Sequence, residues 1–165
     1  LAGASLGTVF QENSLVDECD FVRINKRNIR LTGDIGSVVD NQLYVTGRIK
    51  DILIVNGQNY MASEIEWHAA SQSDALNALA AAAYQLDQTQ ACFLEIELKN
   101  KRTDQIDLAE LALKVKKSVA ARYGVELDEV FILNRGSLPR TSSGKIRRAS
   151  VKAARTEKHD EAEYA

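Results

Sequence analysis

Short apolar runs separated by turn residues dominate the first part of the chain and predict β-hairpins. Asp40-Asn41-Gln42 separates one pair of runs, and Asn56-Gly57 separates the next. An Asn-Gly pair between β-prone residues is a strong hairpin signal, because both residues tolerate a positive φ. Two β-hairpins are therefore expected. The apolar runs lie at residues 37–39 with 43–45, at 52–55 with 58–60 and, more weakly, at 5–10 and 20–24.

Two stretches carry the capping-box pattern that begins a helix. In the first, Ser63 takes the N-cap position and Glu66 the third helical position. In the second, Asp107 and Glu110 take the same positions, and apolar residues then continue at helical spacing until Gly124. Glycine directly after the last apolar turn is a helix stop. We therefore expect one helix that ends near residue 71 and another that ends at residue 123.

The second half of the chain also contains strand patterns. Cys92–Leu98 alternates apolar and polar residues, which predicts a half-buried strand. Residues 79–86 are rich in alanine, which favours helix, but they directly precede a turn-like segment and this strand, so we expect a strand. A short strand at 130–133, a final helix at 146–154 and a frayed polar tail from residue 156 complete the pattern.

This order of elements is typical of an α+β domain with small β-sheets and packed helices. The charged segment around Lys50 lies between the two hairpins and is a natural domain boundary. We expect residues 1–49 to end a larger upstream domain, 50–155 to form a C-terminal domain and 156–165 to form the tail. The chain begins at Leu1 without a methionine, so we expect it to be the C-terminal portion of a larger protein.

The composition is that of a soluble globular protein, with 45% hydrophobic and 27% charged residues. A net charge of −2 does not favour a nucleic-acid or membrane partner. We find neither a signal peptide nor an apolar run that could span a bilayer, so a cytoplasmic location is expected. Cys19 and Cys92 lack metal-ligand spacing, so we expect reduced or buried thiols and no metal site.

Residues 136–148 have the features of an ordered loop. They contain the only proline, Pro139, together with two glycines and three consecutive hydroxyl residues before Lys145. Proline fixes φ, glycine permits a positive φ, and hydroxyls bond to the nearby backbone. The loop could present Lys145 to an anion, although composition alone favours a solvated basic loop. A P-loop is excluded, because Pro139 replaces its first glycine and no Ser or Thr follows Lys145.

Three segments stand out together: Thr32-Gly33-Asp34, then Gly47-Arg48-Ile49-Lys50-Asp51 leading to Asn56-Gly57-Gln58-Asn59 and Glu64-Ile65-Glu66, then Leu138-Pro139-Arg140-Thr141-Ser142-Ser143-Gly144-Lys145. In this order and at these separations they resemble the C-terminal third of the adenylate-forming ligases. These enzymes include acyl-CoA synthetases, peptide adenylation domains, luciferases and fatty acyl-AMP ligases, and the last group is the most similar. The chain departs from the family at Met61-Ala62, where an aromatic-proline pair is usual.

The resemblance implies an enzyme that joins a carboxylic acid, expected to be a fatty acid, to ATP and releases pyrophosphate. The family position of Lys145 implies that it bridges the acyl carboxylate and the α-phosphate, where negative charge grows. Asp34 is implied to accept hydrogen bonds from both ribose hydroxyls, and Arg48 is implied to lie near the ribose. ATP would come with Mg²⁺ that is held mostly by the upstream domain.

The resemblance also implies a moving domain. Lys50 matches the hinge position, and Gly57, Gln58 and Asn59 match the loop that enters the site for thiol transfer. In fatty acyl-AMP ligases the acceptor is typically the thiol of an acyl carrier protein rather than coenzyme A, and these residues do not distinguish the two. The chain alone is expected to be inactive, because it lacks the family's upstream phosphate loop and acyl pocket.

The sequence is also compatible with other functions. An acyl-CoA synthetase or an amino-acid adenylation domain would share the same motifs. A carrier-protein docking module that kept only the fold would not require Asp34, Arg48 and Lys145 together. A nucleic-acid binder is disfavoured because no aromatic stacking platform accompanies the basic residues. The basic residues in question are Arg147, Arg148, Lys152 and Arg155.

Overall fold

The structure is a computed structural model that describes residues 21–24, 26–30, 32–86, 90–100 and 106–163. The backbone forms two compact units, Leu1–Lys50 and Asp51–Ala165. The expected strand at residues 5–10 lies outside the described residues.

The first unit contains two antiparallel hairpins. β1 (Phe21–Ile24) pairs with β2 (Arg27–Arg30), and β3 (Asp34–Val39) pairs with β4 (Gln42–Arg48). The predicted hairpin at 37–45 is therefore confirmed, and its strands are longer than expected. Its turn residues, Asp40 and Asn41, have φ values of 51° and 62°, the left-handed conformation that asparagine and aspartate tolerate best.

The second unit begins with another hairpin, as predicted. The short 3-10 helix η1 (Ile49–Asp51) leads into β5 (Ile52–Val55), which pairs with β6 (Gln58–Met61). Asn56 and Gly57 form the turn with φ values of 52° and 74°. Two successive positive φ angles match the right-handed twist of the flanking strands. The helix α1 (Ala62–Ala70) follows directly.

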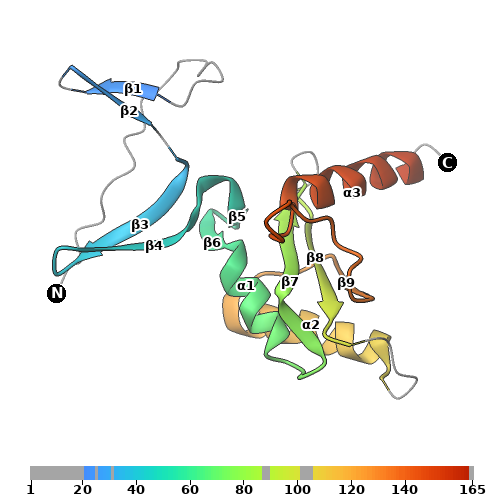
Figure 1. Cartoon of the computed structure of the whole chain (residues 1–165). Helices are drawn as coiled ribbons and strands as arrows, with labels where there is room; N and C mark the ends of the chain where they lie inside the picture. Colours follow the sequence, from blue (N-terminus) through green and yellow to red (C-terminus); the bar gives the residue numbers. More distant parts are fainter. Residues whose placement is uncertain (1–20, 25, 31, 87–89, 101–105, 164–165) are drawn as a thin grey trace. The chain divides into compact units, whose positions relative to one another are not determined.

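A three-stranded sheet forms the centre of the second unit (Figure 1). β7 (Leu76–Gln85) pairs antiparallel with β8 (Cys92–Leu98), and β8 pairs parallel with β9 (Glu129–Leu133). The helix α2 (Leu108–Tyr123) makes the crossover between the two parallel strands. The expected strand at 79–86 is confirmed and begins three residues earlier, at Leu76.

The two capping predictions have different outcomes. Asp107 caps α2 through Oδ1, which accepts hydrogen bonds from the Ala109 and Glu110 amides at 2.9 and 3.0 Å. The predicted cap at Ser63 is wrong, because α1 begins at Ala62 without a side-chain cap. Glu66 does not close a capping box. Its buried carboxylate instead accepts a hydrogen bond from a backbone amide of β7.

β8 is buried along its whole length, so the expectation of a half-buried strand is wrong. One face packs against α1 and α2 through a core that includes Leu94, Ile96 and Val115. On the other face, Phe93 of β8 and Tyr84 of the neighbouring β7 pack together with residues that follow β9. A central strand with both faces covered has no solvent side, and the sheet is therefore a middle layer.

The final helix, α3 (Arg148–Glu163), differs from the prediction at both ends. Ile146 lies outside it, in an isolated antiparallel bridge with Arg140. The helix also continues past residue 154 through much of the expected frayed tail. We attribute this extension to the alanine, glutamate and lysine that follow, which favour helix, and to the absence of glycine and proline after residue 154.

Candidate functional site

The loop between β9 and α3 closes on itself around Lys145. The Thr141 amide donates to the Lys145 carbonyl at 2.8 Å, and the Lys145 amide donates to the Thr141 hydroxyl at 3.1 Å. The Gly144 amide donates to the Thr141 carbonyl at 2.9 Å, and Gly144 has a φ of 82°. A positive φ of this size suits glycine, which has no Cβ. Local hydrogen bonds therefore define the backbone that carries Lys145.

The closed loop is attached to the sheet at its start. Leu138 is 3% exposed and packs on the face of β8 that carries Phe93. Its amide donates to Glu97 Oε1 at 2.7 Å, and Arg140 Nη2 donates to Glu97 Oε2 at 3.0 Å. Arg140 Nη1 in turn donates to the Gly144 carbonyl at 3.2 Å. The buried Glu97 carboxylate thus bonds directly to the start of the loop. Through Arg140 it is also connected to Gly144, the residue before Lys145.

The side chain of Lys145 is exposed. Its ammonium group has no hydrogen-bond or salt-bridge partner among the residues that the structure describes. An exposed cation on a hydrogen-bonded backbone can meet an anion without first breaking an internal ion pair. The geometry therefore suits electrostatic stabilisation of negative charge on a bound ligand.

Arg148, at the first residue of α3, links the loop's exit to two other elements. Its Nε and Nη2 donate to Glu66 Oε1 and Oε2 at 2.9 and 2.6 Å, and its Nη1 donates to Asp51 Oδ2 at 3.3 Å. Glu66 also accepts from the Ala83 amide at 2.9 Å. The hydrogen bond to Glu66 raises the pKa of Arg148 above its usual value. Asp51, the first residue of the second unit, is thereby joined to α3.

Asp34 and Arg48 lie together in the first unit. They are paired residues at the open end of the β3–β4 hairpin, and Arg48 Nε donates to Asp34 Oδ1 at 2.8 Å. Both side chains are partly exposed, at 36% for Asp34 and 63% for Arg48. The expectation was an Asp34 carboxylate that accepts two ligand hydrogen bonds. In the structure, Asp34 Oδ1 also accepts a hydrogen bond from the Arg48 guanidinium.

The remaining predicted site residues lie at backbone features. Lys50 is exposed, lies in η1 and is the last residue of the first unit. Gly57, Gln58 and Asn59 are exposed at the tip of the β5–β6 hairpin, where Gln58 Oε1 accepts a hydrogen bond from the Tyr60 hydroxyl at 2.7 Å. The position of Lys50 suits a hinge. The hairpin tip at residues 57–59 suits an exposed loop that can contact a ligand.

Three glutamates are buried and paired with arginines, which the sequence analysis did not predict. Glu66, Glu95 and Glu97 are 4%, 8% and 0% exposed, and each bonds to an arginine of the C-terminal segment. The available signal was the presence of Glu95 and Glu97 in the otherwise apolar strand β8. The alternation of apolar and polar residues predicted that both glutamates face solvent. Charge pairing explains how they can be buried. The arginines, in the same order, are Arg148, Arg155 and Arg140.

Arg155 shows why the basic residues of α3 are not a free basic surface. Its Nη2 donates to Glu95 Oε1 at 2.9 Å, and its guanidinium lies 3.7 Å from the centre of the Phe131 ring. The Tyr84 hydroxyl also donates to Glu95 at 2.8 Å. Burial and this hydrogen bond raise the pKa of Tyr84 well above its usual value. Arg148 and Arg155 therefore compensate internal charge, which weakens the nucleic-acid alternative further.

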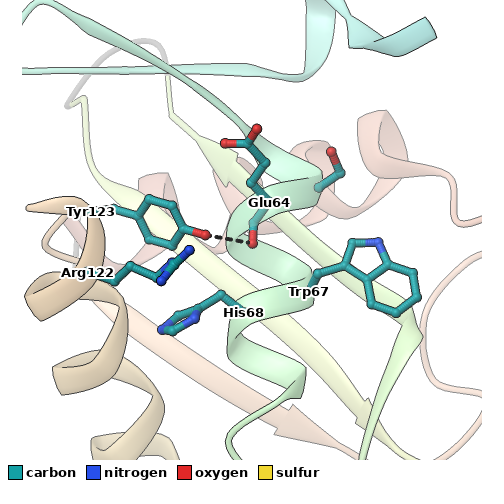
Figure 2. A pocket seen from close by; sticks show the side chains of 6 residues that line it. Glu64, Trp67, His68, Arg122 and Tyr123 are labelled. Carbon is teal, nitrogen blue, oxygen red and sulfur yellow. Dashed lines mark hydrogen bonds between the residues drawn. The ribbon is translucent and has the colours of Figure 1, made fainter. Parts of the chain in front are cut away.

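An open cleft of about 610 Å³ lies between α1 and the end of α2 (Figure 2). His68, on its wall, is 2.8 Å from the Ser118 hydroxyl and packs edge-on against Tyr123. Trp67 is 58% exposed, and the Tyr123 hydroxyl donates to the Glu64 carbonyl at 3.4 Å. The side chain of His68 therefore bonds within the second unit. The lining residues are Ser63, Glu64, Trp67, His68, Arg122 and Tyr123.

The described residues carry no other group with evident chemistry. Cys92 is a buried free thiol, and burial, with a smaller contribution from Asp128, raises its pKa to about 11. Nowhere in the described ranges do three or more His, Cys, Asp or Glu side chains gather as a metal-binding group. No helix of the described chain has the length and apolar character needed to cross a membrane.

Comparisons with known proteins agree on one class of enzyme. The long-chain-fatty-acid–AMP ligase FadD32 of Mycolicibacterium smegmatis is 28% identical over 144 residues, which cover 74% of this chain and 23% of that protein. The medium-chain-fatty-acid–[acyl-carrier-protein] ligase JamA of Moorena producens is 29% identical over 123 residues, which cover 73% of this chain and 21% of that protein. No family model matches the chain.

Solved structures give the same result. A structure from a study of fatty acyl-adenylate ligases of E. coli and L. pneumophila matches with a TM-score of 0.68 and 32% identity over 78% of this chain and 22% of that one. McyG A-PCP complexed with phenylalanyl-adenylate matches with a TM-score of 0.64 and 26% identity over 76% of this chain and 20% of that one. The predicted fold class and the resemblance to adenylate-forming ligases, which are enzymes, are confirmed. The chain spans about a fifth of the length of these relatives.

Proposed function

We propose that this chain is the C-terminal part of a fatty acyl-AMP ligase, which activates a carboxylic acid with ATP and transfers the acyl group to a carrier-protein thiol. The observation that carries the proposal is the exposed ammonium of Lys145 on a loop that Glu97 and Arg140 attach to the sheet. The similarity to fatty-acid–AMP ligases supports the reaction class. The upstream region of the relatives would supply most of the site.

In the first step, a carboxylate oxygen of the acid attacks the α-phosphorus of ATP. A new oxygen–phosphorus bond forms, the bond from the α-phosphorus to the bridging oxygen breaks, and pyrophosphate leaves with that electron pair. Negative charge grows on the phosphoryl oxygens and on the leaving group. Lys145 would lie against the α-phosphate and the acyl carboxylate and stabilise that charge. The positively charged group must be positioned before the reaction, and the closed loop supports this.

Asp34 and Arg48 would bind the ribose. A carboxylate can accept hydrogen bonds from two hydroxyls at once. Arg48, bonded to Asp34 at 2.8 Å, would orient the carboxylate for that purpose. Mg²⁺ usually accompanies ATP in such enzymes and neutralises phosphate charge. The upstream region would hold most of the ion's ligands.

Lys50 would be the pivot between the two steps. Asp51 bonds to Arg148 and lies in the second unit, and this supports a pivot at or before Lys50. Rotation about a few dihedrals is the usual form of hinge motion. It would remove Lys145 from the site and bring in the loop Gly57-Gln58-Asn59 for thiol attack on the acyl carbonyl, with AMP as the leaving group.

The acceptor proposed here is the thiol of a carrier protein. Two relatives are named as acyl-carrier-protein ligases, and one solved neighbour is an A-PCP structure. Another relative is named a putative acyl-CoA synthetase, and one more a putative fatty-acid–CoA ligase. The acceptor is therefore tested directly by offering the intact ligase preformed acyl-AMP with either a carrier protein or coenzyme A and measuring the acylated product by mass spectrometry. A preference for coenzyme A would overturn this part of the proposal.

The role of Lys145 is tested by Lys145→Ala in the intact ligase, meaning this chain joined to the upstream region of its relatives. Acyl-AMP formation should fall by roughly 10²–10³-fold, because one preorganised electrostatic contact is lost. Transfer from preformed acyl-AMP to the thiol should remain. Lys117→Ala, at an exposed lysine of α2, is the matched control and should change neither step. Equal loss of both steps in Lys145→Ala would contradict the assignment. The chain by itself should form no acyl-AMP.

A further inference from the structure

The carboxylate of Glu97 is in the most enclosed position of the three buried glutamates. It is 0% exposed, in the central strand β8, and both of its oxygens accept hydrogen bonds from the segment that carries Lys145. Oε1 accepts from the Leu138 amide at 2.7 Å, and Oε2 accepts from Arg140 at 3.0 Å. Each oxygen thus contacts a different residue of the same loop.

Arg140 extends this contact to the residue before Lys145. Its Nη2 bonds to Glu97, and its Nη1 donates to the Gly144 carbonyl at 3.2 Å. The guanidinium is planar, so the direction of one bond restricts the direction of the other. The bridge between Arg140 and Ile146 places the two sides of the loop opposite each other. Strand β8 therefore controls where the backbone of Lys145 lies.

The other two buried pairs provide a comparison within the same unit. Glu66 pairs with Arg148, and Glu95 pairs with Arg155, at 2.6 and 2.9 Å. In the described part of the unit, the hydrogen bonds of these two pairs run to α3, β7 and Asp51, and none reaches residues 139–145. Among these three pairs, only Glu97–Arg140 makes hydrogen bonds to residues 139–145.

We propose that Glu97, acting through Arg140, is a positioning residue that sets the place of Lys145 for acyl-adenylate formation. This proposal rests on the proposed function of Lys145. A buried ion pair often contributes little to stability compared with apolar residues of equal volume, so its benefit here is geometric. A displacement of about 1 Å at a reacting group can lower a rate roughly 10²-fold. Thiol transfer, in which Lys145 has left the site, should not depend on Glu97.

The test uses Glu97→Gln in the intact ligase, with Glu95→Gln as the matched control. The glutamine oxygen can still accept from the Leu138 amide, but its NH₂ group faces the Arg140 guanidinium, donor against donor. Arg140 should then turn to solvent, and the Gly144 carbonyl should lose its partner. Acyl-AMP formation should fall roughly 10²-fold, while transfer from preformed acyl-AMP stays unchanged. Glu95→Gln should lower the melting temperature about as much as Glu97→Gln does, but it should leave acyl-AMP formation unchanged.

Arg140→Lys provides a second variant that leaves Glu97 paired. Lysine keeps the charge but lacks the fork that contacts Glu97 and Gly144 together, so acyl-AMP formation should fall here too. The double variant Glu97→Gln/Lys145→Ala separates positioning from a general loss of stability. If Glu97 acts through Lys145, the double variant should form acyl-AMP in a single turnover no more slowly than Lys145→Ala.

Three results would overturn the proposal: equal effects of Glu97→Gln and Glu95→Gln on acyl-AMP formation, equal loss of both reaction steps in Glu97→Gln, or rate losses that multiply in the double variant. A different result identifies failure of the proposed function itself. In that case Lys145→Ala alone would form acyl-AMP at the unchanged rate. The two failures are therefore distinguishable in one set of variants.

Discussion

Replacement of Arg148 by methionine should destabilise the second unit strongly. Arg148 makes a two-point contact with the Glu66 carboxylate, at 2.9 and 2.6 Å, and a third bond to Asp51 at 3.3 Å. The Glu66 side chain is 5% exposed and that of Arg148 is 31% exposed. Methionine matches the aliphatic stem of arginine and has no charge, so Arg148→Met removes the partner while largely keeping the packing of that stem.

The size of the effect follows from the charge that stays behind. Removing one partner of a buried ion pair costs about 3–5 kcal/mol, because the other charge remains buried without compensation. The Ala83 amide still donates to Glu66, and Arg148 is partly exposed, so we expect about 3 kcal/mol, the lower end of that range. A domain of ordinary size has roughly 5–15 kcal/mol in total, so the loss is a large fraction.

Urea unfolding of the chain, followed by far-UV circular dichroism and tryptophan fluorescence, measures this loss. Trp67 is the only tryptophan and lies beside Glu66 in α1. With a slope of about 2 kcal/mol per molar urea, the midpoint should fall by roughly 1.5 M. Arg147→Met, at the exposed neighbouring arginine, is the matched control and should shift unfolding by less than about 0.5 kcal/mol.

The double variant Glu66→Gln/Arg148→Met tests the reason for the loss. It removes the uncompensated buried charge of Glu66, so it should be more stable than Arg148→Met alone. Two results would refute the reasoning. One is an Arg148→Met midpoint equal to that of Arg147→Met, and the other is a double variant less stable than the single one.

Two further predictions concern local chemistry. At pH 8, Cys92 in the native protein should react with iodoacetamide about 10²-fold more slowly than in the urea-unfolded chain, because burial raises its pKa from 9.0 to about 11. Peptide mass spectrometry measures the extent of alkylation at Cys92. Equal rates in the two states would contradict the prediction. The same shift stabilises the fold below about pH 9, and this contribution is lost as pH rises through about 11. Asp107→Ala should cost about 1 kcal/mol in urea unfolding, because Oδ1 caps α2, whereas no measurable loss would argue against the cap.

Several elements could be predicted from the sequence because nearby residues decide them. The turns at Asp40-Asn41 and Asn56-Gly57 require positive φ angles that these residues tolerate. Asp107 caps α2 through amides two and three residues away, and Gly124 ends it in the left-handed conformation. In each case the donor, the acceptor and the strain lie within one or two turns of chain.

The same local logic failed where a distant partner was stronger. Ser63 and Glu66 match a capping box, but Glu66 binds Arg148, which is 82 positions away in the sequence. A charged hydrogen bond to a guanidinium is stronger than one to a neutral amide. Likewise Glu95 and Glu97 look like solvent-facing positions, yet both are buried. Pairing with arginines far along the chain makes that burial possible.

For the candidate site, the sequence by itself determined the residue types and their order: Asp34, Arg48, Lys50 and Lys145, in motifs that resemble adenylate-forming ligases. Only the tertiary structure decided what holds Lys145 in place. Its loop is attached through Glu97, 43 positions before Arg140, on a strand whose second face is covered by the segment it orders. A motif specifies short-range chemistry, whereas positioning depends on contacts that exist only after the sheet and the C-terminal segment have packed together.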